Sequence, residues 1–140
     1  MKNKYNIKRA GIMHLLNAFG KSKSIKYIDL SSNDIGPDIA KKLSEILMEN
    51  NLINGFNISA NNIGYEGAIE LINVIRSKKL ITCFNISEND IGDKTAIELI
   101  NVIKKKTSIT DINIRLNKIG NYYEKELIKI AKSKNIKIII

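Results

Sequence analysis

Positions 28–33 read Ile-Asp-Leu-Ser-Ser-Asn, and this stretch decides the fold because three close copies of it follow in the chain. The copies begin at Phe56, Phe84 and Ile112, and successive copies lie 28 residues apart. An isoleucine also stands three residues before each copy, so every unit reads apolar-x-x-apolar-x-apolar-x-x-Asn. A fixed period of this length predicts a repeat protein, in which each unit needs its neighbours to bury its apolar face.

The second half of each unit predicts a corner followed by a helix. Two residues after each asparagine come isoleucine and glycine, as in Ile35-Gly36, and glycine suits a turn because it tolerates positive φ. The same turn is predicted at Gly64, Gly92 and Gly120. Behind each turn, apolar residues recur at helical spacing, which predicts a helix with one buried stripe. The predicted stripes are Ala40, Leu43, Ile46 and Leu47; Ala68, Leu71, Val74 and Ile75; Ala96, Leu99, Val102 and Ile103; and Leu127, Ile130 and Ala131.

The two ends of the chain depart from the repeat. The last helix carries Glu124 where alanine stood, so we expect this helix to be more exposed than the others. At the start, Ile7, Ile12 and Leu15 match the back half of a unit, and at the end Ile136 and Ile139 restore the apolar-x-x-apolar spacing of a strand. We therefore divide one domain, residues 1–140, into a partial repeat (1–24), three full repeats (25–52, 53–80 and 81–108), a terminal repeat (109–135) and a final strand (136–140).

This combination of period, strand motif, corner asparagine and helix resembles the leucine-rich repeat of the ribonuclease-inhibitor type, which also occurs in NOD-like receptors and Ran GTPase activators. The resemblance covers nearly the whole chain, with isoleucine in place of leucine at most framework positions. It implies an α/β solenoid shaped as a horseshoe arc, with a parallel sheet on the concave face and α-helices on the convex face. The class serves many unrelated functions, so the resemblance predicts a fold rather than a function.

Composition narrows the classes of function. The 140 residues are 44% hydrophobic and fit one globular domain, and no apolar run approaches the roughly 20 residues of a membrane span. The first residues lack the apolar core of a secretory signal, so we expect a cytoplasmic protein, with export as an effector left open. A single cysteine, Cys83, and a single histidine, His14, predict neither an internal disulfide nor a metal site. The sequence offers neither residue a catalytic partner, so we predict no enzyme activity and no cofactor.

Strand residues between the apolar positions point away from the core because side chains alternate along a strand. Across the units they form three rows: Tyr27, Gly55, Cys83 and Asp111; Asp29, Asn57, Asn85 and Asn113; and Ser31, Ser59, Ser87 and Arg115. This face is polar and nearly uncharged, and its asparagine and serine rows can equally bond to one another. We predict that it binds a protein partner, with Tyr27 and Arg115 as anchors. The predicted binding residues are Tyr27, Asp29, Asn57, Cys83, Asn85, Asp111, Asn113 and Arg115.

The net charge of +9 leaves a second function open. Cations recur near the predicted helix C-termini, where they can contact nucleic acid phosphates or an acidic protein surface. They also complement the helix macrodipole, which is a purely structural role, and most of them are lysine rather than the bidentate arginine. This predicted basic edge contains Arg76, Lys78, Lys104, Lys106, Lys132 and Lys134.

Two further predictions concern contacts beyond a single unit. We expect the corner asparagines to bond backbone groups of adjacent turns, so we assign them a structural role. They are Asn33, Asn61, Asn89 and Asn117. The final strand has no following repeat to cover it, and its unpaired backbone groups predict a homodimer through this edge as one way to enlarge the binding surface.

Overall fold

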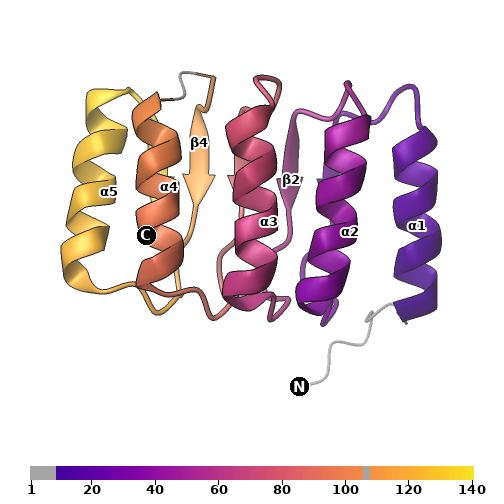
Figure 1. Ribbon diagram of the computed structural model, residues 1–140, viewed down its shortest axis with the longest axis horizontal. Coiled ribbons are helices and arrows are strands. Elements are labelled where there is room, and N and C mark those ends of the chain that lie inside the picture. Colours follow the sequence, from indigo (N-terminus) through magenta and orange to yellow (C-terminus); the bar gives the residue numbers. More distant parts are fainter. Residues whose placement is uncertain (1–8, 106–107) are drawn as a thin grey trace.

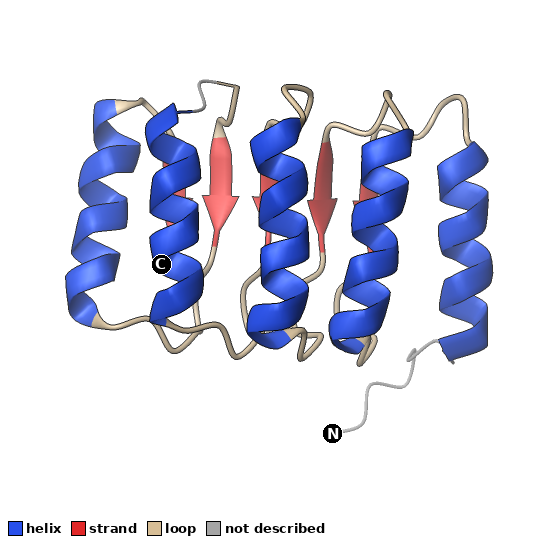
Figure 2. Cartoon of the chain, viewed as in Figure 1, coloured by secondary structure: helices blue, strands red, loops and turns tan. Residues whose placement is uncertain are grey.

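In the part of the chain that the structure describes, five parallel strands form one sheet, and five helices cover one of its faces in a single layer (Figure 1). The structure is a computed structural model that describes residues 9–105 and 108–140. The strands follow one another across the sheet in chain order, and Figure 2 shows them behind a wider row of helices. The predicted α/β solenoid is therefore confirmed. The helices are α1 (Arg9–Lys21), α2 (Gly36–Glu49), α3 (Gly64–Ser77), α4 (Asp93–Lys105) and α5 (Asn121–Ser133), and the strands are β1 (Tyr27–Asp29), β2 (Gly55–Asn57), β3 (Cys83–Asn85), β4 (Asp111–Asn113) and β5 (Lys137–Ile139).

The repeated stretch forms the strands in the register that the sequence predicts. Tyr27 pairs with Gly55, Gly55 with Cys83 and Cys83 with Asp111, all in parallel. The central residue of each of the first four strands is buried in the core. Two of these residues, Phe56 and Phe84, stack with their ring centroids 5.9 Å apart. The sheet is therefore held by apolar contacts behind it, and its opposite face, which we call the sheet face, is left open.

The predicted helix stripes form the core. Every residue of the first three stripes is buried, with at most 5% of its surface exposed. Helix α5 buries Leu127 and Ala131 but leaves Ile130 half-buried, which confirms that the last helix is more exposed. In α1 the buried residues are Ile12 and Leu16, and Leu15 is half-buried. Ile7 falls outside the described residues.

The corner asparagines form a ladder between units, as predicted. Asn61 lies in the interior, with 1% of its surface exposed. Its Nδ2 donates to the Leu30 carbonyl at 2.8 Å, and its Oδ1 accepts from the Asn33 N–H at 2.8 Å. Asn89 and Asn117 make the same pair of bonds to the units before them. The asparagines therefore satisfy buried backbone groups that the sheet does not reach.

The prediction for the corner glycines was half right. Gly36 and Gly64 have φ values of 74° and 59°, and among the described residues they are the only glycines with positive φ. Gly92 instead pairs with Lys118 in a parallel bridge, and Gly120 has φ −73°. Other residue types therefore carry most of the left-handed turns. These residues are Ser32, Asp34, Ala60, Asn62, Glu88, Asp90, Leu116 and Asn135.

Candidate protein-binding surface

The first row of the sheet face is shaped by a glycine. Tyr27 is 48% exposed and Asp111 is exposed, but Gly55 is buried. A Cβ atom at Gly55 would lie 2.5 Å from Cys83 Sγ and 2.9 Å from Tyr27 Cδ2, so both side chains close over the glycine. Space rather than φ requires glycine here, and the missing side chain lets the Tyr27 ring lie against the sheet.

The second row bonds mainly within each unit. Oδ1 of Asp29, Asn57, Asn85 and Asn113 each accepts the backbone N–H two residues on, at 2.9 to 3.2 Å. Among the described residues one bond crosses between units in this row, from Asn57 Nδ2 to Asp29 Oδ2 at 3.3 Å. Nδ2 of Asn85 and of Asn113 donates to none of the described residues. These two amides therefore keep N–H groups available to a ligand.

A shallow hollow of about 170 Å³ lies on the sheet face. The predicted residues that line it are Tyr27, Cys83, Asn85, Asp111 and Asn113. The other predicted residues, Asp29, Asn57 and Arg115, do not line it. The two predicted anchors, Tyr27 and Arg115, are therefore not brought together in one hollow.

Two lining residues, Lys137 and Ile139 of β5, were missed by the sequence analysis. The apolar-x-x-apolar spacing from Ile136 turns Ile139 inward, but β5 pairs Ile138 with the core residue Ile112 and leaves Ile139 40% exposed. Residues 138–140 are all isoleucine, so no alternation of apolar and polar residues shows which of them faces the core. The charged Lys137, which lies opposite Asp111 on the open face, was the signal that could have corrected the register.

Tyr27 stays a hydrogen-bond donor at neutral pH. Burial raises the pKa of its hydroxyl above 10.0, and the neighbouring Cys83 and Asp29 raise it further. Both neighbours oppose a negative charge on the phenol. The sheet face therefore offers an aromatic ring with a protonated hydroxyl beside two free amide groups.

Two lysines of the basic edge cap the preceding helix. Lys78 Nζ donates to the carbonyl of Asn50, the C-cap of α2, at 3.1 Å. Lys134 Nζ donates to the carbonyl of Lys104 near the end of α4 at 3.0 Å. The last carbonyls of a helix have no partner within it, so these contacts have a structural role. Burial also lowers the pKa of Lys78 from 10.5.

The other cations of the basic edge differ in their contacts. Arg76 pairs with Glu98 of α4 at 2.7 Å and also donates to Asn73 at 2.7 Å. Lys104 and Lys132 are exposed. Lys106 lies outside the described residues. The edge is therefore a mixture of caps, an ion pair and exposed lysines rather than one uniform surface.

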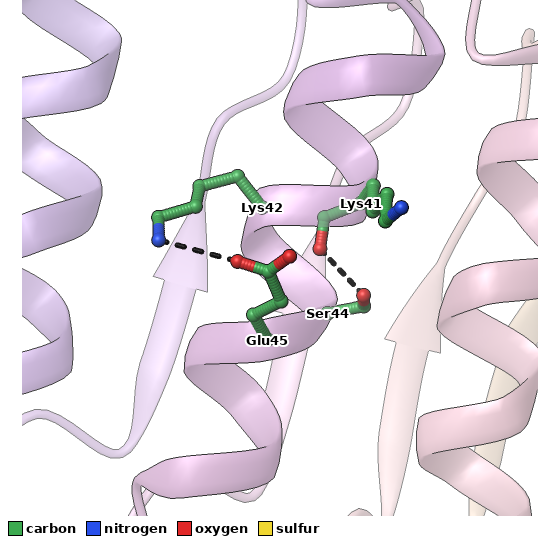
Figure 3. Close-up of polar contacts among 4 residues, drawn as sticks. All are labelled: Lys41, Lys42, Ser44 and Glu45. Carbon is green, nitrogen blue, oxygen red and sulfur yellow. Dashed lines mark hydrogen bonds and ion pairs between the residues drawn. The ribbon is translucent and has the colours of Figure 1, made fainter.

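The single histidine and the single cysteine lie on opposite layers of the molecule. His14 is exposed on α1, as predicted, and Cys83 is half-buried on the sheet face. At the position of α2 equivalent to His14, Lys42 pairs with Glu45 at 3.2 Å on the outer surface (Figure 3). His14 and Cys83 therefore cannot act as a base and a nucleophile on each other.

The described residues contain no group of three or more side chains placed to hold a metal ion, and no described helix is long and apolar enough to cross a membrane.

Comparison with known proteins identifies the repeat. The model of the Leucine Rich repeat family matches residues 21–44, 49–71 and 78–99. The chain is a leucine-rich repeat protein. The alternation of strands with full helices agrees with the ribonuclease-inhibitor type that the sequence resembles. No curated protein matches the chain.

Two solved structures share the fold of this leucine-rich repeat protein. One is described as leiomodin-1 actin-binding site 2, with a TM-score of 0.75 and 17% identity over 91% of this chain and 78% of that one. The other is the tropomodulin C-terminal domain of Caenorhabditis elegans, with a TM-score of 0.78 and 15% identity over 92% of this chain and 81% of that one. At these identities the likeness concerns the fold.

Proposed function

We propose that this protein is a non-enzymatic protein-interaction module that binds a partner through the sheet face and its adjoining loops. One observation carries the proposal: the exposed ring of Tyr27 borders a hollow that is also lined by the free amide groups of Asn85 and Asn113. An aromatic side chain beside unsatisfied polar groups is typical of the anchors that dominate protein interfaces.

The size of the surface favours a segment of a protein over a small molecule. The hollow of about 170 Å³ is smaller than the roughly 300 to 1,000 Å³ of most ligand pockets, so it suits one inserted side chain. Five strands at about 4.8 Å spacing give a sheet roughly 20 to 25 Å across. Such a sheet presents on the order of 300 Å², well under the roughly 800 Å² per partner of a standard interface. Loops beside the sheet must therefore contribute to any tight complex.

Actin is the first named protein to test as a partner. The description of one structural neighbour names an actin-binding site, and that neighbour shares the fold over 91% of this chain. Cosedimentation of the full chain with actin filaments tests this choice directly. Capture from a cell lysate extends the search to other proteins.

A triple variant tests the sheet face itself. Asn85→Asp and Asn113→Asp remove the free N–H donors but keep the Oδ1 atoms that accept from the backbone, and Tyr27→Ala removes the ring. We expect the triple variant to lose at least about tenfold in affinity for the captured protein. The matched control is Tyr122→Ala, because Tyr122 is also an exposed tyrosine, at 69%, but lies on α5. Equal capture by the triple variant and the control would contradict the proposal.

Binding of nucleic acid or an acidic surface through the basic edge is the alternative function. It has weaker support because Lys78 and Lys134 hold helix carbonyls and Arg76 is paired with Glu98. Affinity for an oligonucleotide that falls steeply between low and physiological salt would favour it, and absent or salt-independent binding would exclude it. A cytoplasmic location, export as an effector and a homodimer through β5 stay predictions.

A further inference from the structure

A hollow of about 750 Å³ lies between α4 and the C-terminal end of α3, two neighbouring helices of the outer layer (Figure 1). Among the described residues that line it are Arg76, Lys79, Glu98, Val102, Lys105 and Ser108. Its volume falls within the roughly 300 to 1,000 Å³ of most small-molecule pockets, whereas the hollow on the sheet face has only about 170 Å³. The helix layer therefore contains a hollow large enough for a small molecule.

The spacing of the helices explains why the hollow opens here. Helix α3 packs closely on α2 through Gly67, where a Cβ atom would lie 3.1 Å from Ala40 Cβ. The equivalent residue of α4, 28 positions later, is Thr95, and its side chain is buried. Helix α3 accordingly packs more extensively against α2 than against α4. The bulkier threonine therefore leaves room between α3 and α4 that the glycine removes between α2 and α3.

Three cations line the hollow where the preceding unit has uncharged residues. The positions of Arg76, Lys79 and Lys105 correspond to Met48, Asn51 and Ser77. Lys79 and Lys105 are exposed, and neither pairs with a carboxylate of the described residues. Arg76 bonds to Glu98 and Asn73, but a guanidinium has more N–H donors than these two bonds use. The cations outnumber the one carboxylate of the lining, so the hollow attracts an anion.

A serine replaces an apolar residue in the wall of the hollow. Leu80 stands at the equivalent position of the preceding unit, where Ser108 has a much shorter side chain. The Oγ atom of Ser108 is buried and has no hydrogen-bond partner among the described residues. A buried hydroxyl without a partner is uncommon, because it has given up its bonds to water. An acceptor oxygen of a ligand in the hollow would supply the missing bond.

The helix ends beside the hollow do not exclude an anion. The C-terminus of a helix repels negative charge through carbonyls that have no partner within the helix. The Lys104 carbonyl near the end of α4 accepts from Lys134 Nζ at 3.0 Å, and the Val74 carbonyl of α3 accepts from the N–H of Lys78 at 2.8 Å. These bonds and the cations of the lining offset the repulsion.

We propose that the hollow between α3 and α4 binds a phosphorylated small molecule. A phosphate monoester carries about −1.5 to −2 charge at pH 7 and has three strong acceptor oxygens, so it matches several donors better than a carboxylate does. Lys79 and Lys105 pair with the phosphate, and the Ser108 hydroxyl donates to one of its oxygens. The organic part of the ligand lies against Val102. The hollow is separate from the sheet face, so the proposal does not rest on the function proposed above.

Titration of the ¹⁵N-labelled full chain, followed by NMR, tests the site. The probes are phenyl phosphate, AMP and glucose 6-phosphate, each compared with its dephosphorylated counterpart: phenol, adenosine and glucose. We expect at least one phosphate to shift the amide signals of Lys79, Lys105 and Ser108 with a Kd below about 1 mM. Its counterpart should bind at least about tenfold less tightly, because the cations recognise the phosphate group. Absence of saturable shifts with all three phosphates up to about 10 mM would overturn the proposal.

Variants that copy the preceding unit separate the hollow from surface charge. Ser108→Leu keeps every cation but fills the space, and we expect it to weaken binding of the phosphate at least about tenfold. The double variant Lys79→Asn, Lys105→Ser keeps the space but removes two charges, and it should weaken binding to a similar extent. The matched control is Lys129→Ala, an exposed lysine on α5, and urea unfolding checks that each variant keeps its fold. Unchanged affinity in Ser108→Leu would assign the binding to surface charge and overturn the proposal.

Two further probes identify the source of the phosphate. Inorganic phosphate that binds as tightly as the best organic phosphate would show that no organic part is recognised, which would overturn the small molecule as ligand. A phosphoserine peptide that binds at least about tenfold more tightly than all three small phosphates would assign the hollow to a segment of a protein, with the same result. The expected order of affinity is the organic phosphate first, then inorganic phosphate and the peptide.

Discussion

Replacing Asn89 by alanine removes a fully buried rung of the asparagine ladder. Asn89 is 0% exposed, and its Oδ1 accepts from the N–H groups of Asn61 at 3.0 Å and Ile63 at 3.3 Å. Its Nδ2 donates to the carbonyls of Ile58 and Ser87, both at 2.9 Å. One side chain therefore satisfies four backbone groups in two neighbouring units, and alanine can satisfy none of them.

The expected loss of stability follows from the two N–H groups. A buried donor left without an acceptor costs about 1 to 3 kcal/mol, and the Asn61 and Ile63 donors both lose the acceptor described above. The carbonyls lose less, because an oxygen has two lone pairs and the Ile58 carbonyl also accepts from Asn61 Nδ2. We therefore expect the free energy of unfolding to fall by about 3 to 5 kcal/mol, a large part of the roughly 5 to 15 kcal/mol of a typical domain.

Urea unfolding followed by circular dichroism at equilibrium measures this loss. The control is Asn101→Ala, since Asn101 is an exposed asparagine on α4 and its substitution should change stability by no more than about 0.5 kcal/mol. Hydrogen exchange localises the effect, because the amides of Asn61 and Ile63 should lose protection first. A loss below about 1 kcal/mol, or unchanged exchange at these two amides, would refute the reasoning that the ladder holds the units together.

Three further predictions concern the sheet face and the basic edge. Gly55→Ala should destabilise the chain by about 1 to 3 kcal/mol and displace Tyr27, because the new methyl overlaps Cys83 Sγ; an unchanged unfolding midpoint would contradict the close approach. Lys78→Ala should cost about 1 kcal/mol through loss of the α2 cap, while Lys104→Ala should cost less than about 0.5 kcal/mol, and equal losses in urea unfolding would argue against capping. The pKa of Tyr27 is raised on folding, so its contribution to stability holds below pH 10.0 and is lost as the pH rises through its folded pKa. The melting temperature of the wild type should therefore fall more steeply above pH 10.0 than that of Tyr27→Phe, and parallel curves would contradict the shift.

Repetition explains why so much of the fold could be predicted. A position that recurs four times at one spacing reveals its environment far better than a single residue does. The inward residues of the first four strands and the stripes of α2, α3 and α4 were predicted in this way, and all of them are buried. The prediction failed where repetition ends, at Ile139 in a run of isoleucines.

The candidate site was harder to predict because sequence spacing does not set the hydrogen-bond partners of a side chain. Sequence spacing placed Cys83, Asn85 and Asn113 on one face, but it could not show which amide groups remain free after local turns are bonded. Spacing also grouped Lys78 with Lys104 as one edge. A long lysine side chain can reach a carbonyl 28 residues away, as Lys78 reaches Asn50, so the two lysines have different roles.

The sequence by itself determined the period, the parallel register, the buried stripes and the structural role of the corner asparagines. These features depend on which residues are apolar and how far apart they lie, and both can be read from a linear chain. The tertiary structure alone decided that Tyr27 and Cys83 close over Gly55 and that Lys78 and Lys134 cap helices. Those contacts depend on which side chains lie next to one another in space. The neighbours of a side chain are fixed only when the units have stacked.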